Sequence, residues 1–155
     1  MTGEPDALIA AAEANDPNAL APLAYVRALG YCQPRAVDEA LDLLARSAAL
    51  GWNPAQRELR FLARGEGSDW RALRARIDVA ALRMPPPKHA ISESPRLRVF
   101  PAFATPAECD WLIERGRAEL KPTQVYQSDM VPREGRRRTN SDFVLTTCDL
   151  VVCLI

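Results

Sequence analysis

A run of three prolines, Pro85-Pro86-Pro87, divides this chain of 155 residues into two unlike parts. Proline lacks the backbone N–H, and its ring clashes with the preceding helical turn, so no regular helix crosses the run. Consecutive prolines favour the extended polyproline II conformation. Because no periodic apolar pattern follows before residue 96, we interpret residues 85–94 as a Pro-rich linker between units at 1–84 and 95–155.

The first unit carries the pattern of short amphipathic helices. The clearest helix is predicted at about 38–50, where apolar residues recur at i, i+3, i+4 and i+7 before Gly51. Further helices are predicted at about 7–12, 19–29 and 54–63 and from residue 69 onward. Asp6 is expected to cap the first of these helices. The last is expected to bury four apolar side chains: Trp70, Leu73, Ile77 and Ala81.

Two of these predicted helices are similar to each other. The pattern Ala19-x-x-x-Leu23-x-Tyr25-Val26 returns as Ala55-x-x-x-Leu59-x-Phe61-Leu62, at an offset of 36 residues. That offset is typical of helical repeats. With Gly30, Asp38-Glu39-Ala40 and Ala48-Ala49-x-Gly51, the segment resembles the Sel-one-like subclass of tetratricopeptide repeats. The resemblance implies a helical repeat domain that binds a protein or peptide partner; an unrelated helical hairpin bundle is the alternative.

The second unit mixes strand and helix patterns. Residues 96–100 alternate polar and apolar, as in a half-buried strand, and further strands are expected at 123–126 and 142–146. Thr105-Pro106-Ala107-Glu108 has the spacing of a capping box with proline at the first helical position, which predicts a helix to about residue 120. We expect that helix to turn Cys109, Leu112 and Ile113 inward. The chain is therefore expected to belong to the α+β class.

The order of these features resembles the beginning of a prolyl 4-hydroxylase-like, iron- and 2-oxoglutarate-dependent dioxygenase domain. The matching segments are Ser94–Val99, Phe103–Ile113, Arg138-Thr139-Asn140-Ser141 and Asp149–Val152. The resemblance implies that residues 95–155 are the incomplete, truncated lead-in portion of a double-stranded β-helix oxygenase domain. That family uses ferrous iron, 2-oxoglutarate and ascorbate, and in these relatives the substrate is peptidyl proline. By the same resemblance, Arg138, Asn140 and Ser141 are the candidate substrate-binding residues.

The histidine content does not fit an iron site within this chain. The family holds its iron on an H-x-D…H motif, the facial triad of non-heme oxygenases, whereas this sequence has one histidine, His89, and no H-x-D. We therefore expect no catalytic and no metal-binding residue here, the iron ligands lying beyond Ile155, and no oxygenase activity from this chain alone. Whether it is an enzyme stays open. The alternative function is a helical-repeat interaction scaffold with a non-catalytic oxygenase remnant.

Charge and composition narrow the choice of partners. Lys and Arg number 20 and Asp and Glu also number 20, so the net charge is zero. The arginine cluster at 133–138 is therefore interpreted as a solvated loop and not as a nucleic-acid site. No apolar run reaches the roughly 20 residues that span a bilayer, and the acidic start differs from a signal peptide. We predict a cytoplasmic protein without nucleic-acid or membrane partners, whose four cysteines are small buried residues: Cys32, Cys109, Cys148 and Cys153.

The end of the sequence predicts a helix with no polar face. Asp149 is expected to cap it, and residues 150–155 are all apolar, so this helix must be buried against something. We expect its partner to be missing, because the resemblance places that partner in the barrel beyond Ile155. Residues 94–155 are therefore predicted to be poorly stable by themselves, whereas residues 4–83 are predicted to fold independently as a helical unit.

Overall fold

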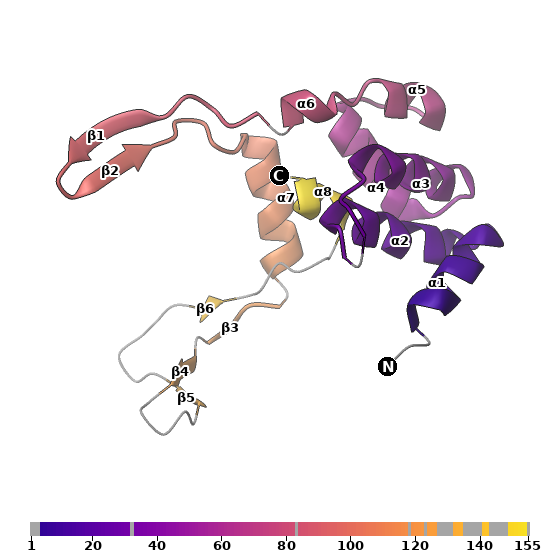
Figure 1. The fold of residues 1–155 in the computed structure, drawn as a ribbon, viewed down its shortest axis with the longest axis horizontal. Coiled ribbons are helices and arrows are strands. Elements are labelled where there is room, and N and C mark those ends of the chain that lie inside the picture. The colour runs from indigo at the N-terminus through magenta and orange to yellow at the C-terminus, as the bar shows by residue number, and fades with distance from the viewer. Residues whose placement is uncertain are drawn as a thin grey trace.

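The computed structural model describes residues 4–31, 33–82, 84–117, 119–122, 124–126, 132–134, 141–142 and 149–154. The fold is α+β, with helices first and short antiparallel strand pairs after them (Figure 1). The helices before the prolines are α1 (Glu4–Glu13), α2 (Pro17–Leu29), α3 (Val37–Ala49), α4 (Asn53–Ala63), α5 (Trp70–Ala75) and α6 (Val79–Leu82). After them come β1 (His89–Glu93), β2 (Arg96–Val99), α7 (Pro106–Arg117), β3 (Lys121–Pro122), β4 (Gln124–Tyr126), β5 (Pro132–Glu134), β6 (Ser141–Asp142) and α8 (Leu150–Leu154).

The ends of the central helices follow local sequence signals. Asp16 caps α2 by accepting a hydrogen bond from the Asn18 backbone N–H at 2.9 Å. Gly30 ends α2 in the left-handed conformation, with φ of 76°, which glycine adopts without steric cost. The predicted cap at Asp6 is wrong, because α1 already begins at Glu4 and Asp6 lies inside it.

The helix predicted from residue 69 is divided into two. Asp69 accepts a hydrogen bond from the Ala72 N–H at 2.9 Å and starts α5, and Asp78 accepts one from the Ala81 N–H at 3.0 Å and starts α6. Each aspartate therefore acts as a cap, and the second one begins a new helix. Leu73 and Ile77 are buried as expected and Trp70 is half-buried, but Ala81 is exposed, because it follows the break.

One hydrophobic cluster joins the helices on both sides of the proline run. Its fully buried members include Leu20, Leu41, Leu44 and Leu59, from α2, α3 and α4. The same cluster continues into α7 and α8. Within the helical part, the related positions of α2 and α4 are buried alike, at Ala19 and Leu23 and at Ala55 and Leu59. A tetratricopeptide-like repeat domain itself stays a prediction.

The strands form three separate antiparallel pairs: β1 with β2, β3 with β6 and β4 with β5. The β1–β2 hairpin extends away from the helices (Figure 1), in a register that pairs His89 with Val99 and Glu93 with Arg96. Strand β2 confirms the strand expected from residue 96, and β4 falls within the one expected at 123–126. Strand β1 was missed, since it lies in the segment interpreted as linker and lacks the polar–apolar alternation of β2. Most of the strand expected at 142–146 lies outside the described residues.

The capping box at the start of α7 is confirmed. The Glu108 carboxylate accepts a hydrogen bond from the Thr105 N–H at 2.7 Å, and the Thr105 hydroxyl oxygen accepts one from the Glu108 N–H at 3.2 Å. The predicted inward face of this helix is wrong at two of its three positions. Leu112 is half-buried, but Cys109 and Ile113 are exposed and Trp111 is the buried residue, because α7 turns its indole toward α4.

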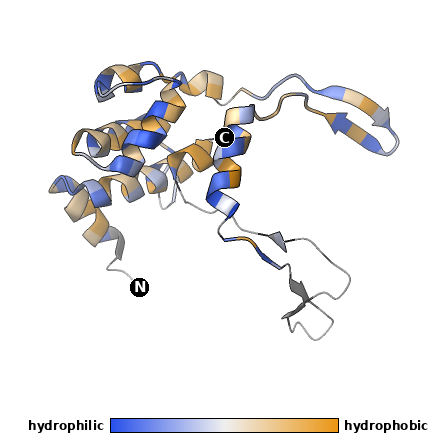
Figure 2. Ribbon diagram, turned by 180° about the vertical axis from the view of Figure 1, so that it is seen from behind, coloured by the Kyte–Doolittle hydropathy of each residue, from blue (hydrophilic) through white to orange (hydrophobic). Residues whose placement is uncertain are grey.

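The last helix has a partner after all. Asp149 caps α8 by accepting a hydrogen bond from the Val152 N–H at 2.8 Å, as predicted. Leu150 and Val151 are fully buried and Leu154 nearly so, against α2 and α4. Figure 2 shows hydrophobic residues along α8 where it lies among the other helices. The expectation that α8 lacks a partner is therefore wrong, because the helical part supplies one.

The structure describes two of the four cysteines. Cys109 is exposed and Cys153 half-buried, so the expectation of uniformly buried cysteines is wrong at Cys109. Cys32 and Cys148 lie outside the described residues.

Among the helices that the structure describes, none has both the length and the apolar character to cross a bilayer.

Candidate functional site

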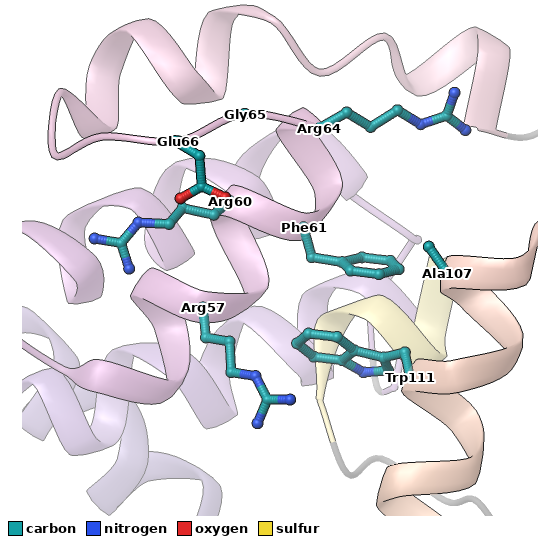
Figure 3. A pocket seen from close by; sticks show the side chains of 8 residues that line it. All are labelled: Arg57, Arg60, Phe61, Arg64, Gly65, Glu66, Ala107 and Trp111. Atoms are coloured by element: carbon teal, nitrogen blue, oxygen red, sulfur yellow. The ribbon is translucent and has the colours of Figure 1, made fainter.

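A pocket of about 430 Å³ opens between α4 and α7, the two helices that carry most of its lining. This volume lies within the range of small-molecule and side-chain binding sites. Figure 3 shows the lining side chains, which come mainly from α4 and the turn after it. They are Arg57, Arg60, Phe61, Arg64, Gly65, Glu66, Ala107 and Trp111.

Two aromatic rings form the apolar wall of this pocket. The rings of Phe61 and Trp111 lie with centroids 4.6 Å apart and planes tilted by 43° (Figure 3). The guanidinium carbons of Arg57 and Arg115 each lie 4.8 Å from the centroid of the Trp111 ring, a distance at which cation–π attraction is effective. The Trp111 Nε1–H donates to the Asp149 carboxylate at 3.1 Å. The indole is therefore held in position by several independent contacts.

Three arginines of the pocket lining come from α4 and its C-terminal end. Arg57 and Arg60 are spaced at i and i+3 on α4, which places them on one side of the helix, and Arg64 follows as the residue that ends it. Arg57 forms an ion pair with Glu114 of α7, and the hydrogen bond from Arg57 lowers the pKa of the Glu114 carboxyl. The Arg60 Nε donates to the Gly67 carbonyl at 2.9 Å, and its guanidinium lies 4.7 Å from the centroid of the Trp70 ring.

Two buried carboxylates lie behind the aromatic wall, at Glu58 and Asp149, each only 1% exposed. Glu58 accepts hydrogen bonds from the Tyr25 hydroxyl at 2.9 Å and from the Leu150 N–H at 2.7 Å. Asp149 accepts a hydrogen bond from Trp111 and forms an ion pair with Arg115 at 2.7 Å. The network therefore ties α2 and α4 of the helical part to α7 and α8.

Burial changes the proton affinity of this network. Removal from water, with a further contribution from the negative charge of Asp149, raises the pKa of Glu58 from its ordinary 4.5 to about 7, although the hydrogen bonds from Leu150 and Tyr25 oppose the shift. Burial and the charge of Glu58 also raise the pKa of the Tyr25 hydroxyl far above its ordinary value. Tyr25 therefore stays a hydrogen-bond donor at all physiological pH values.

Of the three residues predicted to bind substrate, the structure describes Ser141, which does not line the pocket. Ser141 is exposed at the start of β6, where it pairs with Pro122 of β3. Arg138 and Asn140 lie outside the described residues. Their substrate-binding role therefore stays a prediction.

The described residues do not fit an iron centre of the kind that the dioxygenase resemblance implies. Within the described ranges, no three His, Cys, Asp or Glu side chains gather in a group that is able to hold a metal ion. His89, the one histidine in the sequence, is exposed on β1. Ferrous iron, 2-oxoglutarate and ascorbate therefore stay predictions from that resemblance.

The sequence patterns predicted neither the pocket nor the buried carboxylates behind it, although two signals pointed to them. Glu58 stands on the apolar stripe of its helix between Ala55 and Leu62, where a charged residue requires a buried partner. The arginine spacing along the same helix is the second signal. The position of Trp111 gave no such signal, because its burial depends on how α7 packs against α4.

Comparisons with known proteins identify no relative. No family model matches the chain, and neither a curated protein nor a solved structure matches it.

Proposed function

We propose that this chain is a protein-interaction module: a helical scaffold that binds a peptide segment in the pocket between α4 and α7. The observation that carries the proposal is the composition of that pocket, an aromatic wall of Phe61 and Trp111 bordered by three arginines. Tryptophan and arginine are the residue types most enriched among the energetically dominant residues of protein interfaces. The pocket volume suits one or two peptide side chains.

Rigidity of the wall supports the same proposal. Trp111 is 5% exposed and is fixed by its hydrogen bond to Asp149 and by two guanidinium contacts. A partner therefore loses little free energy in ordering this surface, because the surface is ordered before binding. A loose hydrophobic groove would not offer this advantage.

A plug in the pocket tests the proposal. Ala107 lines the pocket and is exposed at the start of α7, so Ala107→Trp fills the space without disturbing the core. Ala72→Trp is the matched control, because Ala72 is an exposed alanine in the first turn of α5. Peptides selected by the wild-type chain from a random display library should lose binding to the Ala107→Trp protein and keep it with the control. Equal binding by both variants would refute the pocket as the binding site.

A second candidate is an N-terminal part of a 2-oxoglutarate-dependent dioxygenase that acts on peptidyl proline. What supports it is a set of exposed apolar residues on the β1–β2 hairpin, the following loop and α7, a surface suited to packing against a further layer. These residues are Ile91, Leu97, Val99, Phe100, Phe103 and Ile113. In this proposal Arg138, Asn140 and Ser141 contact the substrate, and the interaction module presents a protein partner to the oxygenase.

The reading frame after the codon for Ile155 tests this second candidate. An in-frame or frame-shifted continuation that encodes H-x-D, a distant His and a downstream Lys or Arg would support it. Unrelated sequence would remove it and leave the interaction module.

A further inference from the structure

We infer that the segment recognised by the α4–α7 pocket is acidic, with negatively charged side chains on both sides of one apolar residue; this inference rests on the proposed interaction function. The pocket lining holds three arginines and one glutamate, Glu66. Of these three arginines, Arg57 alone forms an ion pair among the described residues, and its partner is Glu114. Arg60 and Arg64 form no ion pair within the part of the chain that the structure describes.

The surroundings of the pocket add to this charge. The ideal Cβ position of Gly65 lies 2.6 Å from an Arg76 guanidinium nitrogen, so a fourth guanidinium packs against the turn that lines the pocket. Two other arginines of the helical part, Arg27 and Arg74, are neutralised by ion pairs within the chain. Arg74, for example, forms ion pairs with Asp38 and Asp42, both at 2.8 Å. At the pocket, four guanidinium groups therefore stand against two carboxylates, those of Glu66 and Glu114.

Arg60 is held in a geometry that suits an anionic ligand. The Arg60 Nε donates a hydrogen bond to the Gly67 carbonyl, and its guanidinium stacks over the Trp70 ring. The two terminal nitrogens are left for a ligand. A guanidinium fixed in this way binds a carboxylate or phosphate through two parallel hydrogen bonds at a reduced entropic cost. In Figure 3 the side chains of Arg57, Arg60 and Arg64 point in different directions around Phe61. This arrangement fits acidic groups that flank a central apolar side chain.

A peptide suits this pocket better than a nucleic acid. The chain has no net charge, and sequence-independent binding to nucleic acid needs many phosphate contacts along an extended basic surface. The carboxylates of Glu66 and Glu114 also border the pocket and would repel a continuous phosphate backbone. An isolated carboxylate or phosphorylated side chain avoids this repulsion, because it meets one arginine at a time.

Synthetic peptides test the inference by fluorescence polarisation. Four labelled peptides share a central phenylalanine and differ in two residues on each side: glutamate, phosphoserine, glutamine or lysine. We expect the glutamate peptide, the phosphoserine peptide or both to bind about tenfold tighter than the glutamine peptide, and the lysine peptide to bind weakest. The stronger of the two anionic peptides identifies the source of the charge. Equal affinity of all four would overturn the inference.

Three variants separate a loss of charge recognition from misfolding, because each changes the affinity for the anionic peptides in a different direction or not at all. Arg60→Gln with Arg64→Gln should reduce the affinity for the anionic peptides to that for the neutral one, whereas Arg71→Gln, an exposed arginine of α5 outside the pocket, should change nothing. Glu114→Gln should instead strengthen binding, because it frees Arg57. Weaker binding by the Glu114→Gln protein would overturn the inference. Displacement of the anionic peptides by the unlabelled glutamine peptide as effectively as by the unlabelled glutamate peptide would also overturn it.

The inference and the proposed function fail in different ways. Display-selected peptides that are blocked by Ala107→Trp but show no preference for acidic residues would leave the interaction module standing and overturn its acidic specificity. Insensitivity of every bound peptide to Ala107→Trp would overturn both. Competition by a single-stranded RNA stronger than by the acidic peptides would replace the peptide with a nucleic-acid partner and overturn the inference.

Discussion

Glu58 has an unusual position for a carboxylate, since it lies in the core and accepts hydrogen bonds from two other helices. The Tyr25 hydroxyl and the Leu150 N–H both donate to it, so its two oxygens satisfy groups that would otherwise be buried without partners. Burial of an ionised carboxylate is costly, and the raised pKa of about 7 expresses that cost. The proton on Glu58 therefore affects how firmly α8 is held.

The pH dependence of stability follows from this shift. The unfolded chain has an ordinary Glu58 pKa of 4.5 and the folded chain one of about 7. Between these values the folded state binds more protons, so the free energy of unfolding falls as the pH rises from about 5 to 7 and then levels off. The total change is at most about 3 kcal/mol. Urea denaturation at a series of pH values measures it.

The control for this prediction is Glu58→Gln, which keeps the size of the side chain. Its amide oxygen accepts from Leu150 and its amide nitrogen donates to the Tyr25 oxygen, so the packing is preserved. Every other titrating group is shared, and we expect the decline between pH 5 and 7 to disappear in the variant. The same decline in both proteins would show that Glu58 does not titrate as described.

Trp111 is the second residue whose role is testable on its own. Trp111→Phe keeps an aromatic ring against Phe61 but removes the Nε1–H that donates to Asp149. Loss of a hydrogen bond to a buried charged group should lower the free energy of unfolding by about 1–3 kcal/mol. Chemical denaturation measures the loss, and Trp70→Phe, which keeps a half-buried ring outside this network, is the comparison. An unchanged stability in the Trp111→Phe protein would contradict the network.

At the scale of elements, α8 shows how tertiary packing stabilises a helix too short to be stable alone. Helices of fewer than about 12 residues are marginal in water, and α8 spans Leu150–Leu154. Its stability comes from the burial of Leu150, Val151 and Leu154 against α2 and α4. Each such side chain contributes roughly 1.5–3 kcal/mol on burial.

Truncation of one buried side chain tests the docking of α8. Leu150→Ala should cost about 2–5 kcal/mol, the range for buried leucines that leave a cavity. Val152→Ala, at a half-buried position of the same helix, should cost clearly less. Thermal melts of the full chain compare the two. Equal losses would mean that α8 is not packed as described.

The same elements show what the sequence was able to predict. Local signals were sufficient for the Gly30 end of α2, the capping box at Thr105 and the cap at Asp149, because each depends on residues within one turn. They failed for the inward face of α7, since the choice between Trp111 and Ile113 depends on the position of α4. Strand β1 failed for a similar reason: its pairing with β2 supplies order that its own composition does not predict.

At the scale of the whole molecule, the proline run separates two patterns of sequence but not two cores. The hydrophobic cluster draws on helices from both sides of it, and the buried network of Glu58 and Asp149 lies where they meet. The β1–β2 hairpin stands apart from this body (Figure 1). The pocket between α4 and α7 therefore exists only while both parts are packed together.

One prediction for the whole chain concerns catalysis. A facial triad requires two histidines and a carboxylate, and the sequence has a single histidine. We expect the purified chain, supplied with ferrous iron and ascorbate, to convert no 2-oxoglutarate to succinate. Succinate formation above a metal-free control would contradict this.

The most direct test of the interaction module is an NMR titration of the ¹⁵N-labelled chain with the glutamate peptide. The backbone amides of Gly65 and Ala107 and the indole N–H of Trp111 report on the pocket from the turn after α4 and from α7. We predict saturable shift changes at these three signals, with little change at Ala72 on α5. Shift changes confined to the β1–β2 hairpin, or none at any peptide concentration, would contradict the assignment of the α4–α7 pocket as the binding site.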